Sequence, residues 1–171
     1  NSFRSFSNNG DKTVLLLEGC VQSTLSPNTN AAAQTLLTAL GYQVIREQSV
    51  ACCGAVNHHL SQTEKTRQLI SNNLERWHQI NKQTPLHAII STASGCGIML
   101  KDYPNLLQQH SSISELDNNL LEKIKDISEL LDATTLLNRV DNFTPHGGSI
   151  TFHAPCTLSH GHKLAQHLLS Q

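Results

Sequence analysis

Four short apolar runs are spaced along the chain, and longer stretches of mixed character separate them. The runs cover residues 13–17, 42–49, 88–91 and 150–152. The first is continuous, which is typical of a strand covered on both faces of a sheet. We therefore predict four strands in this order.

Helical signals occupy the stretches between these runs. Ser26 followed by Pro27 is typical of a helix start, and Gly41 predicts the end of that helix. Ser61 and Glu64 fit a capping box at the start of the longest helix. Each of the first two strands is thus predicted to lead into a helix.

The pattern after the third strand is more complex. A helix from about residue 98 should stop or bend near Pro104. Apolar residues then recur at steps of three and four over residues 113–131, which predicts an amphipathic helix with a break. A last helical pattern covers residues 162–169.

This alternation of strands and helices predicts the fold class. Strands that alternate with helices favour right-handed crossovers between parallel strands. We predict an α/β fold with a mostly parallel sheet and helices on both faces, a Rossmann-like three-layer sandwich. At 171 residues the chain is long enough for one globular domain.

Charge and hydropathy argue against several classes of binding partner. The chain has 12 Lys+Arg, 13 Asp+Glu and a net charge of −1, which is not the footprint of nucleic-acid or anionic-membrane binding. No run approaches the roughly 18 apolar residues of a transmembrane segment, and the N-terminus lacks a signal-peptide core. We expect a soluble, cytoplasmic protein.

The cysteines carry the candidate chemistry. Five cysteines, an odd number, indicate metal or redox use in a cytosolic chain rather than a disulfide framework. Each cysteine position follows a predicted strand directly, so a parallel sheet would gather them at its carboxyl edge, where α/β sheets bind ligands. The positions are Cys20, Cys52-Cys53, Cys96 and Cys156.

The adjacent pair Cys52-Cys53 is the most specific signal. Neighbouring side chains of an extended segment point to opposite faces, so one small ion is awkward for both to chelate. A cluster of several irons can take one thiolate on each of two irons, and Gly54 permits a positive φ or a close approach to the inorganic core. The pair therefore indicates an iron–sulfur centre.

The ends of the chain suggest a fragment. It lacks an initiator Met and ends within an apparently helical pattern. Residues 1–12 are polar and should form a flexible lead-in. The stretch 17–20 resembles 152–156, each followed by a loop and a helix, so we expect residues 13–148 to form one domain and 149–171 to begin a truncated second copy. Cys156 would then be a ligand of a different site.

Four cysteine motifs together resemble a known family. They are Gly19-Cys20-Val21-Gln22, Ala51-Cys52-Cys53-Gly54-Ala55-Val56-Asn57, Thr92-Ala93-Ser94-Gly95-Cys96-Gly97 and Phe152-His153-Ala154-Pro155-Cys156-Thr157-Leu158. They are similar to the cysteine-rich CCG region of glycolate oxidase iron–sulfur subunits. That region is shared with a subunit of heterodisulfide reductase, with lactate-utilisation subunits and with the iron–sulfur subunit of anaerobic glycerol-3-phosphate dehydrogenase.

The resemblance implies an electron-transfer subunit of a flavin-containing complex that oxidises glycolate to glyoxylate. Another subunit, carrying FAD, would perform the hydride chemistry, so the isolated chain should not oxidise glycolate. The complex could attach peripherally to the inner membrane. By position, Cys20, Cys52, Cys53 and Cys96 are the implied ligands of the first copy, with Gly54 beside them.

One motif departs from the family pattern. Heterodisulfide reductase subunits with an unusual cluster have paired cysteines at the end of the copy, where this chain has only Cys96. Four thiolates suffice for a 4Fe-4S cubane, whereas a five-ligand arrangement would need another cysteine.

Three other functions remain open at this point. The fold could be a docking scaffold for the flavin subunit with structural cysteines, or a dithiol/disulfide redox module at Cys52-Cys53 or between Cys20 and Cys96. The histidine-rich end could bind zinc, although its spacing resembles no closed structural zinc site. The residues concerned are His153, Cys156, His160 and His162.

Overall fold

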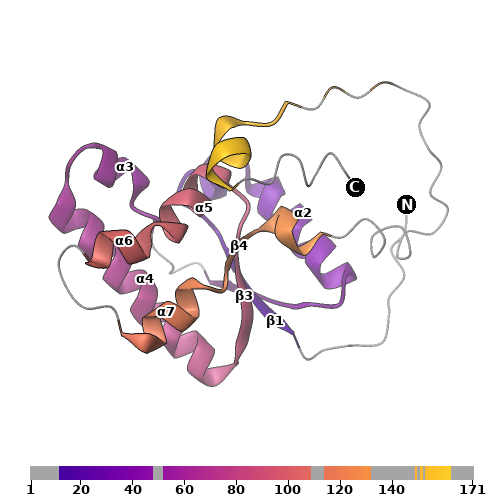
Figure 1. Cartoon of the computed structure of the whole chain (residues 1–171). Coiled ribbons are helices and arrows are strands. Elements are labelled where there is room, and N and C mark those ends of the chain that lie inside the picture. The colour runs from indigo at the N-terminus through magenta and orange to yellow at the C-terminus, as the bar shows by residue number, and fades with distance from the viewer. Residues whose placement is uncertain are drawn as a thin grey trace.

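The structure is a computed structural model that describes residues 12–47, 52–108, 114–131, 149, 151 and 153–162. At its centre lies a four-stranded sheet whose strands are all parallel and follow the order β2-β1-β3-β4 (Figure 1). The strands are β1 (Thr13–Leu17), β2 (Gln43–Glu47), β3 (Leu86–Ser91) and β4 (Ile124–Asp126).

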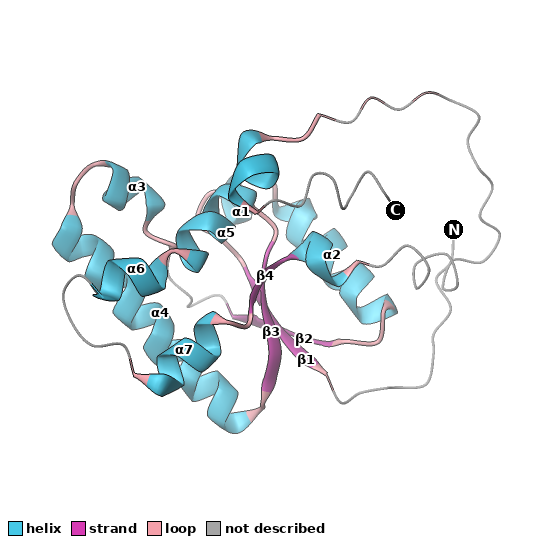
Figure 2. Ribbon diagram, viewed as in Figure 1, coloured by secondary structure: helices cyan, strands magenta, loops and turns pink. Residues whose placement is uncertain are grey.

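Helices connect the strands and flank the sheet (Figure 2). They are α1 (Gln22–Leu25), α2 (Pro27–Ala39), α3 (Ala55–His59), α4 (Thr63–Gln83), α5 (Ser94–Lys101), α6 (Tyr103–Gln108), α7 (Glu115–Leu121), the 3-10 turn η1 (Ile127–Leu130) and the π-helical turn η2 (Thr157–Gly161). Within the described residues, none of these helices has the length and apolar character that crossing a bilayer requires.

Alternate residues of the central strands enter two separate cores. On one face Leu15 and Ile89 pack against α4, α5, α6 and α7, around the fully buried Trp77. On the other face Val14 and Leu16 pack against α2. The sheet is therefore buried on both sides, which explains why its strands are nearly continuous apolar runs. The predicted three-layer α/β fold is confirmed.

The strand order places a reversal between β1 and β3. The chain goes outward from β1 to β2 and then crosses back to place β3 on the other side of β1. In parallel sheets, the loops after the two strands at such a reversal diverge and leave a crevice at the carboxyl edge. The loops after β1 and β3 border this crevice.

The periodicity over residues 113–131 is helical only in its first part. α7 ends at Leu121, and the chain then forms β4, whose Ile124 pairs with Ile89 of β3. The predicted break is therefore present, but the predicted helix beyond it is wrong, because a helix and a short strand both send apolar residues into the same core. The fourth predicted strand, 150–152, lies largely outside the described residues, and Thr151 belongs to no strand.

The predicted capping box at Ser61 and Glu64 is also wrong. Ser61 has a φ of 58°, and its amide donates to the carbonyl of His58 at the end of α3. A residue in the left-handed region that closes one helix does not have the extended conformation of a cap for the next. α4 begins at Thr63 instead, without a side-chain cap.

A helix does follow the third strand, but it starts earlier than predicted. α5 begins at Ser94, so Cys96 lies in its first turn. Pro104 is the second residue of α6, a position where the missing amide hydrogen costs little. α5 ends at Lys101, so the predicted stop or bend near this proline is confirmed as a stop. The predicted helix over 162–169 lies outside the described residues apart from His162.

We expect Ile89→Ala to destabilise the fold strongly. Ile89 is fully buried in β3 between two neighbouring strands, and the cavity left by its truncation should cost about 2–5 kcal/mol. Urea unfolding monitored by circular dichroism measures the change. Leu25→Ala is the matched control, because Leu25 is 79% exposed and its truncation should change stability by less than about 0.5 kcal/mol. Equal effects would contradict the described core.

Candidate functional site

Four cysteine side chains meet at the carboxyl edge of the sheet. Cys20 follows β1, Cys52 and Cys53 follow β2, and Cys96 lies in the first turn of α5 after β3. The Cys20 Sγ and Cys52 Sγ atoms are 3.3 Å apart, and the side chains of Cys53 and Cys96 lie close enough for each to shift the pKa of the other. We call these four residues the thiol cluster.

The adjacent cysteines divide the thiol cluster into two pairs. Cys52 is half-buried and contacts the exposed Cys20, whereas Cys53 is buried and contacts Cys96. This arrangement follows from the opposite directions of neighbouring side chains. Gly54, with a φ of 89°, turns the chain directly after the pair, which confirms that this glycine adopts a conformation unfavourable for other residues.

Two buried side chains hold the backbone of the cysteine pair. The Asn73 amide nitrogen donates to the carbonyl oxygen of Cys52 at 3.2 Å and to the Tyr103 hydroxyl at 3.0 Å. The hydroxyl in turn donates to the carbonyl oxygen of Cys53 at 2.9 Å. Burial raises the pKa of Tyr103, which keeps this donor protonated. Both carbonyls are therefore fixed from the core.

The thiols perturb one another. The hydrogen bond to Cys96, and then burial, raise the pKa of Cys53, and the same hydrogen bond lowers the pKa of Cys96. Burial, and then the neighbouring Cys52, raise the pKa of Cys20. Four thiolates at this spacing repel one another, so full ionisation requires a cationic group among them.

Backbone amides favour negative charge on the sulfur atoms. The Gly54 amide donates to Cys52 Sγ at 3.5 Å, and the amides of Val21 and Ala55 partly offset the rise in the pKa of Cys20 and of Cys53. Each of these amides lies just after the cysteine it contacts. The turns that place the thiols therefore also supply hydrogen bonds to them.

A polar frame borders the outer pair. Glu18 accepts hydrogen bonds from Arg46 and from Asn30, and Asn30 also accepts one from Thr92 after β3. The hydrogen bond from Arg46 lowers the pKa of Glu18. This frame joins β1, β2, α2 and the loop after β3 beside a cavity of about 360 Å³ that Cys20 also lines.

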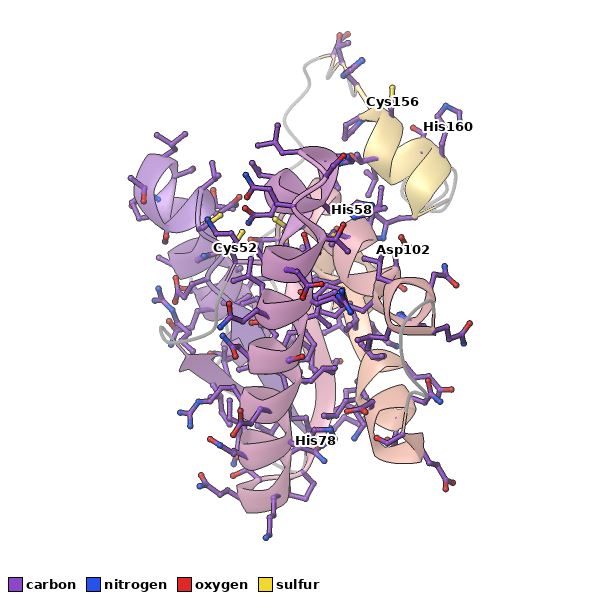
Figure 3. All side chains as sticks on the ribbon, turned by 90° about the vertical axis from the view of Figure 1, so that its left-hand side faces the viewer. Cys52, His58, His78, Asp102, Cys156 and His160 are labelled. Atoms are coloured by element: carbon purple, nitrogen blue, oxygen red, sulfur yellow. The ribbon has the colours of Figure 1, made fainter. Side chains whose placement is uncertain are left out.

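Cys156 lies apart from the thiol cluster. It is exposed beside η2, and Figure 3 shows it well separated from Cys52, with its sulfur directed outward. η2 packs on α5, where the Thr157 and Ser94 hydroxyls are 2.7 Å apart and His162 Nε2 is 2.9 Å from the Ser94 carbonyl oxygen. The structure therefore does not bring the fifth cysteine together with the other four.

The histidines do not form a metal centre in the part of the chain described. There, no three histidine, cysteine, aspartate or glutamate side chains are arranged around one metal ion. His153 and His160 are exposed, and His162 is buried against α5. The zinc alternative therefore gains no support from this arrangement.

Sequence reasoning missed the residues that support the thiol cluster. Asn73 has the clearest signal, because it is a polar residue on the buried face of α4 beside Ile70, Leu74 and Trp77. Tyr103 and the Glu18–Arg46 pair had no comparable signal, since their partners come from distant segments.

The sequence around the thiol cluster matches a known domain family. The family model described as a cysteine-rich domain, CCG, matches residues 14–101. The chain belongs to the CCG cysteine-rich domain family. The matched region contains the whole thiol cluster and most of the elements that surround it. The family identified from the four sequence motifs is thus confirmed.

Several curated proteins are similar over most of the chain. The glycolate oxidase iron–sulfur subunit of Escherichia coli (strain K12) is 38% identical over 154 residues, 90% of this chain and 37% of that protein. The probable glycolate oxidase iron–sulfur subunit of Bacillus subtilis (strain 168) is 30% identical over 70% of this chain and 26% of that protein. The chain thus spans about a third of these relatives.

A more distant relative has a different name. Lactate utilization protein A of Bacillus pumilus (strain SAFR-032) is 24% identical over 85% of this chain and 58% of that protein. No solved structure gives a significant match to the chain.

We expect Tyr103→Phe to weaken the fold at the cysteine pair. The variant keeps the ring but leaves the Cys53 carbonyl without its described donor, which should cost about 1–3 kcal/mol. Urea unfolding measures the loss. The control is Tyr42→Phe at the chain's other tyrosine, which is half-buried and stacks on His87. A loss at Tyr103 no larger than at Tyr42 would contradict the role of its hydroxyl.

We expect Glu18→Gln to reduce the acid sensitivity of the fold. The folded-state pKa of Glu18 lies below the ordinary 4.5 because Arg46 stabilises the carboxylate. Its contribution is therefore present above the unfolded pKa and is lost as the pH falls through the lower folded pKa. Urea midpoints measured above and below pH 4.5 should differ less in Glu18→Gln than in the unmodified chain.

The control for acid sensitivity is Glu64→Gln. Glu64 has 83% of its side chain exposed, so this variant should keep the pH dependence of the unmodified chain. If Glu18→Gln lost stability on acidification as steeply as the unmodified chain, the Glu18–Arg46 pair would not contribute to the pH dependence.

Proposed function

We propose that Cys20, Cys52, Cys53 and Cys96 bind an iron–sulfur cluster, and that the chain is the electron-transfer part of a glycolate oxidase complex. The observation that carries this proposal is the meeting of four thiols from three strand ends at one edge of the sheet. Thiolates are the ligands that hold iron–sulfur clusters in proteins.

The arrangement of the donors fits a multi-iron group. The two sulfur pairs diverge from one peptide, and no three metal-binding side chains in the described part surround a single ion. A group with several irons can accept one thiolate at each iron and supplies the positive charge that four ionised thiols need. Four thiolates match a 4Fe-4S cubane, which we propose as the cluster type.

When bound, such a group supplies one-electron relay. The chain's own residues would determine how it is held. Asn73 and Tyr103 fix the carbonyls of the cysteine pair, and the amides that point at the sulfur atoms favour the reduced, more negative state. The buried Cys53 keeps one side of the site away from bulk solvent.

The relatives support the proposed complex. Two of them are named glycolate oxidase iron–sulfur subunits, so we propose glycolate as the substrate of the assembly and a partner oxidase subunit that carries FAD. We further propose a cytoplasmic location, with peripheral attachment to the inner membrane through the complex. The chain itself would perform no hydride chemistry.

Apolar surface beside the thiols supports docking of such a partner. In the described part of the chain, four large apolar side chains are exposed, and all lie on or next to the short helices α1 and α3 that follow the cysteines. They are Val21, Leu25, Val56 and Leu60. Exposed apolar groups gathered beside a functional site are typical of interaction surfaces.

The domain limits also remain proposals. We propose that residues 13–148 form the first CCG domain and that residues 149–171 begin a second, with Cys156 as a ligand of another metal site. The separation of Cys156 from the thiol cluster supports a separate role.

Anaerobic reconstitution with iron and sulfide tests the cluster. We expect broad visible absorption that dithionite bleaches, with about four irons bound per chain for a cubane. Cys52→Ser and Cys53→Ser should each abolish most of the absorption, because each removes a proposed ligand. Cys156→Ser is the matched control and should retain it, because Cys156 lies apart from the thiol cluster.

Three other results would contradict the cluster. Stoichiometric zinc without iron uptake would indicate a structural metal site. A thiol count that changes reversibly without metal would indicate a dithiol/disulfide module. Co-purification of metal-free chain with a flavoprotein partner would indicate a docking scaffold.

A further inference from the structure

A small cavity lies directly beneath the inner cysteine pair. Its volume is about 20 Å³, and it is bordered by the loops after β1 and β3, by α4, and by Cys53 and Cys96. It therefore occupies the crevice at the strand reversal. A cavity holds one water molecule when its volume exceeds about 10–15 Å³ and two or more polar groups line it.

Two side chains at this cavity have unused hydrogen-bonding atoms. Asn73 and Trp77 both line it, and both are almost fully buried, with exposed fractions of 1% and 0%. Asn73 Oδ1 and Trp77 Nε1 have no partner among the described residues. Leaving such atoms unpaired in the core costs about 1–3 kcal/mol each.

The orientation of the Asn73 amide is fixed by its other partners. Its nitrogen faces the carbonyl oxygen of Cys52, which can only accept. The same nitrogen donates to the Tyr103 hydroxyl, whose own hydrogen is directed to Cys53. The amide oxygen must therefore remain the free atom, so the core presents one acceptor and one donor.

Several other polar side chains at the cavity already have partners. The Ser91 hydroxyl donates to the Ala93 carbonyl, and the Thr92 hydroxyl donates to Asn30. Among the described residues that line the cavity, the buried atoms without a partner thus both come from α4, one turn apart on the face that packs against the sheet.

We propose that this cavity binds a single water molecule that links Trp77 and Asn73 to the sulfur atoms of Cys53 and Cys96. The water accepts from the Trp77 indole N–H and donates one hydrogen to Asn73 Oδ1. Its second hydrogen is then free to donate to a neighbouring sulfur. A cysteine thiol is only a weak donor and a weak acceptor, whereas one water molecule satisfies both the indole and the amide oxygen.

The site has a consequence for charge on the thiol cluster. A donor held rigidly under the sulfur atoms stabilises added negative charge there, and hydrogen bonds to sulfur are one determinant of cluster reduction potential. Trp77 and Asn73 are then positioning residues, because they act on the sulfur atoms through the water. The effect on the potential rests on the proposed function, whereas the water itself does not.

Nuclear magnetic resonance of the metal-free chain tests the water directly. The chain has a single tryptophan, so its indole proton gives one unambiguous signal. We expect a cross-peak between this proton and water with opposite signs in NOESY and ROESY spectra, which marks a long-lived bound water. Absence of the peak, or peaks of the same sign that mark proton exchange alone, would overturn the proposal.

Two variants test whether the cross-peak depends on the proposed water-binding atoms. Asn73→Leu keeps the approximate size of the side chain but removes the acceptor, so the cross-peak should disappear. Tyr42→Phe is the matched control, since it removes a hydroxyl that lies on the other core and away from the cavity, and it should retain the peak. A peak that persists in folded Asn73→Leu would contradict the site, and the unmodified chain decides the question if that variant does not fold.

The reduction potential of the reconstituted cluster tests whether the water acts on the sulfur atoms. In reconstituted chain, Trp77→Phe should lower the potential, because the water loses its anchor. Ile80→Val, a buried change one turn further along α4 and away from the cavity, should leave it unchanged. An equal potential in Trp77→Phe and the unmodified chain would refute the link. Failure to assemble any cluster would refute the proposed function, and the water signal would still decide the cavity.

Discussion

A parallel sheet sends every chain segment that leaves a strand to the same edge, and this constraint organises the molecule. It brings the ends of β1, β2 and β3 together, although more than thirty residues of sequence separate Cys20 from Cys52 and Cys53 from Cys96. The strand reversal between β1 and β3 then opens the space between the converging loops. The sulfur atoms meet because of topology, and local sequence only decides which loop carries each of them.

The convergence of the loops alone would not stabilise such a site. Ionised thiols repel one another, and the backbone carbonyls of Cys52 and Cys53 need hydrogen-bond donors. Side chains from the helices of the core supply these donors. α4 supplies Asn73 and α6 supplies Tyr103, which together satisfy the carbonyls of the cysteine pair. These helices also form part of the larger core. The hydrophobic packing of one face therefore helps to fix the positions of the polar groups at the carboxyl edge.

Much of the fold could be predicted from the sequence because its signals are local. The runs at β1, β2 and β3 and the proline and glycine at the ends of α2 each identify an element without reference to the rest. β4 could not be found this way, since three residues are too short to show a period and Ile124 continues the spacing of α7. The capping signal at Ser61 failed because the preceding helix uses that residue to close itself.

The four cysteines of the site could be predicted from the sequence because each of them follows a strand. Their partners in the core could not, because the hydrogen bonds to Cys52 and Cys53 come from distant segments of the chain.

The cysteines of the thiol cluster differ in burial, from exposed Cys20 through half-buried Cys52 and Cys96 to buried Cys53. A dissolved oxidant can therefore reach Cys20 more easily than Cys53. The loop after β1 is thus the side of the thiol cluster most accessible to oxidation, and the buried Cys53 is the best protected of the four cysteines.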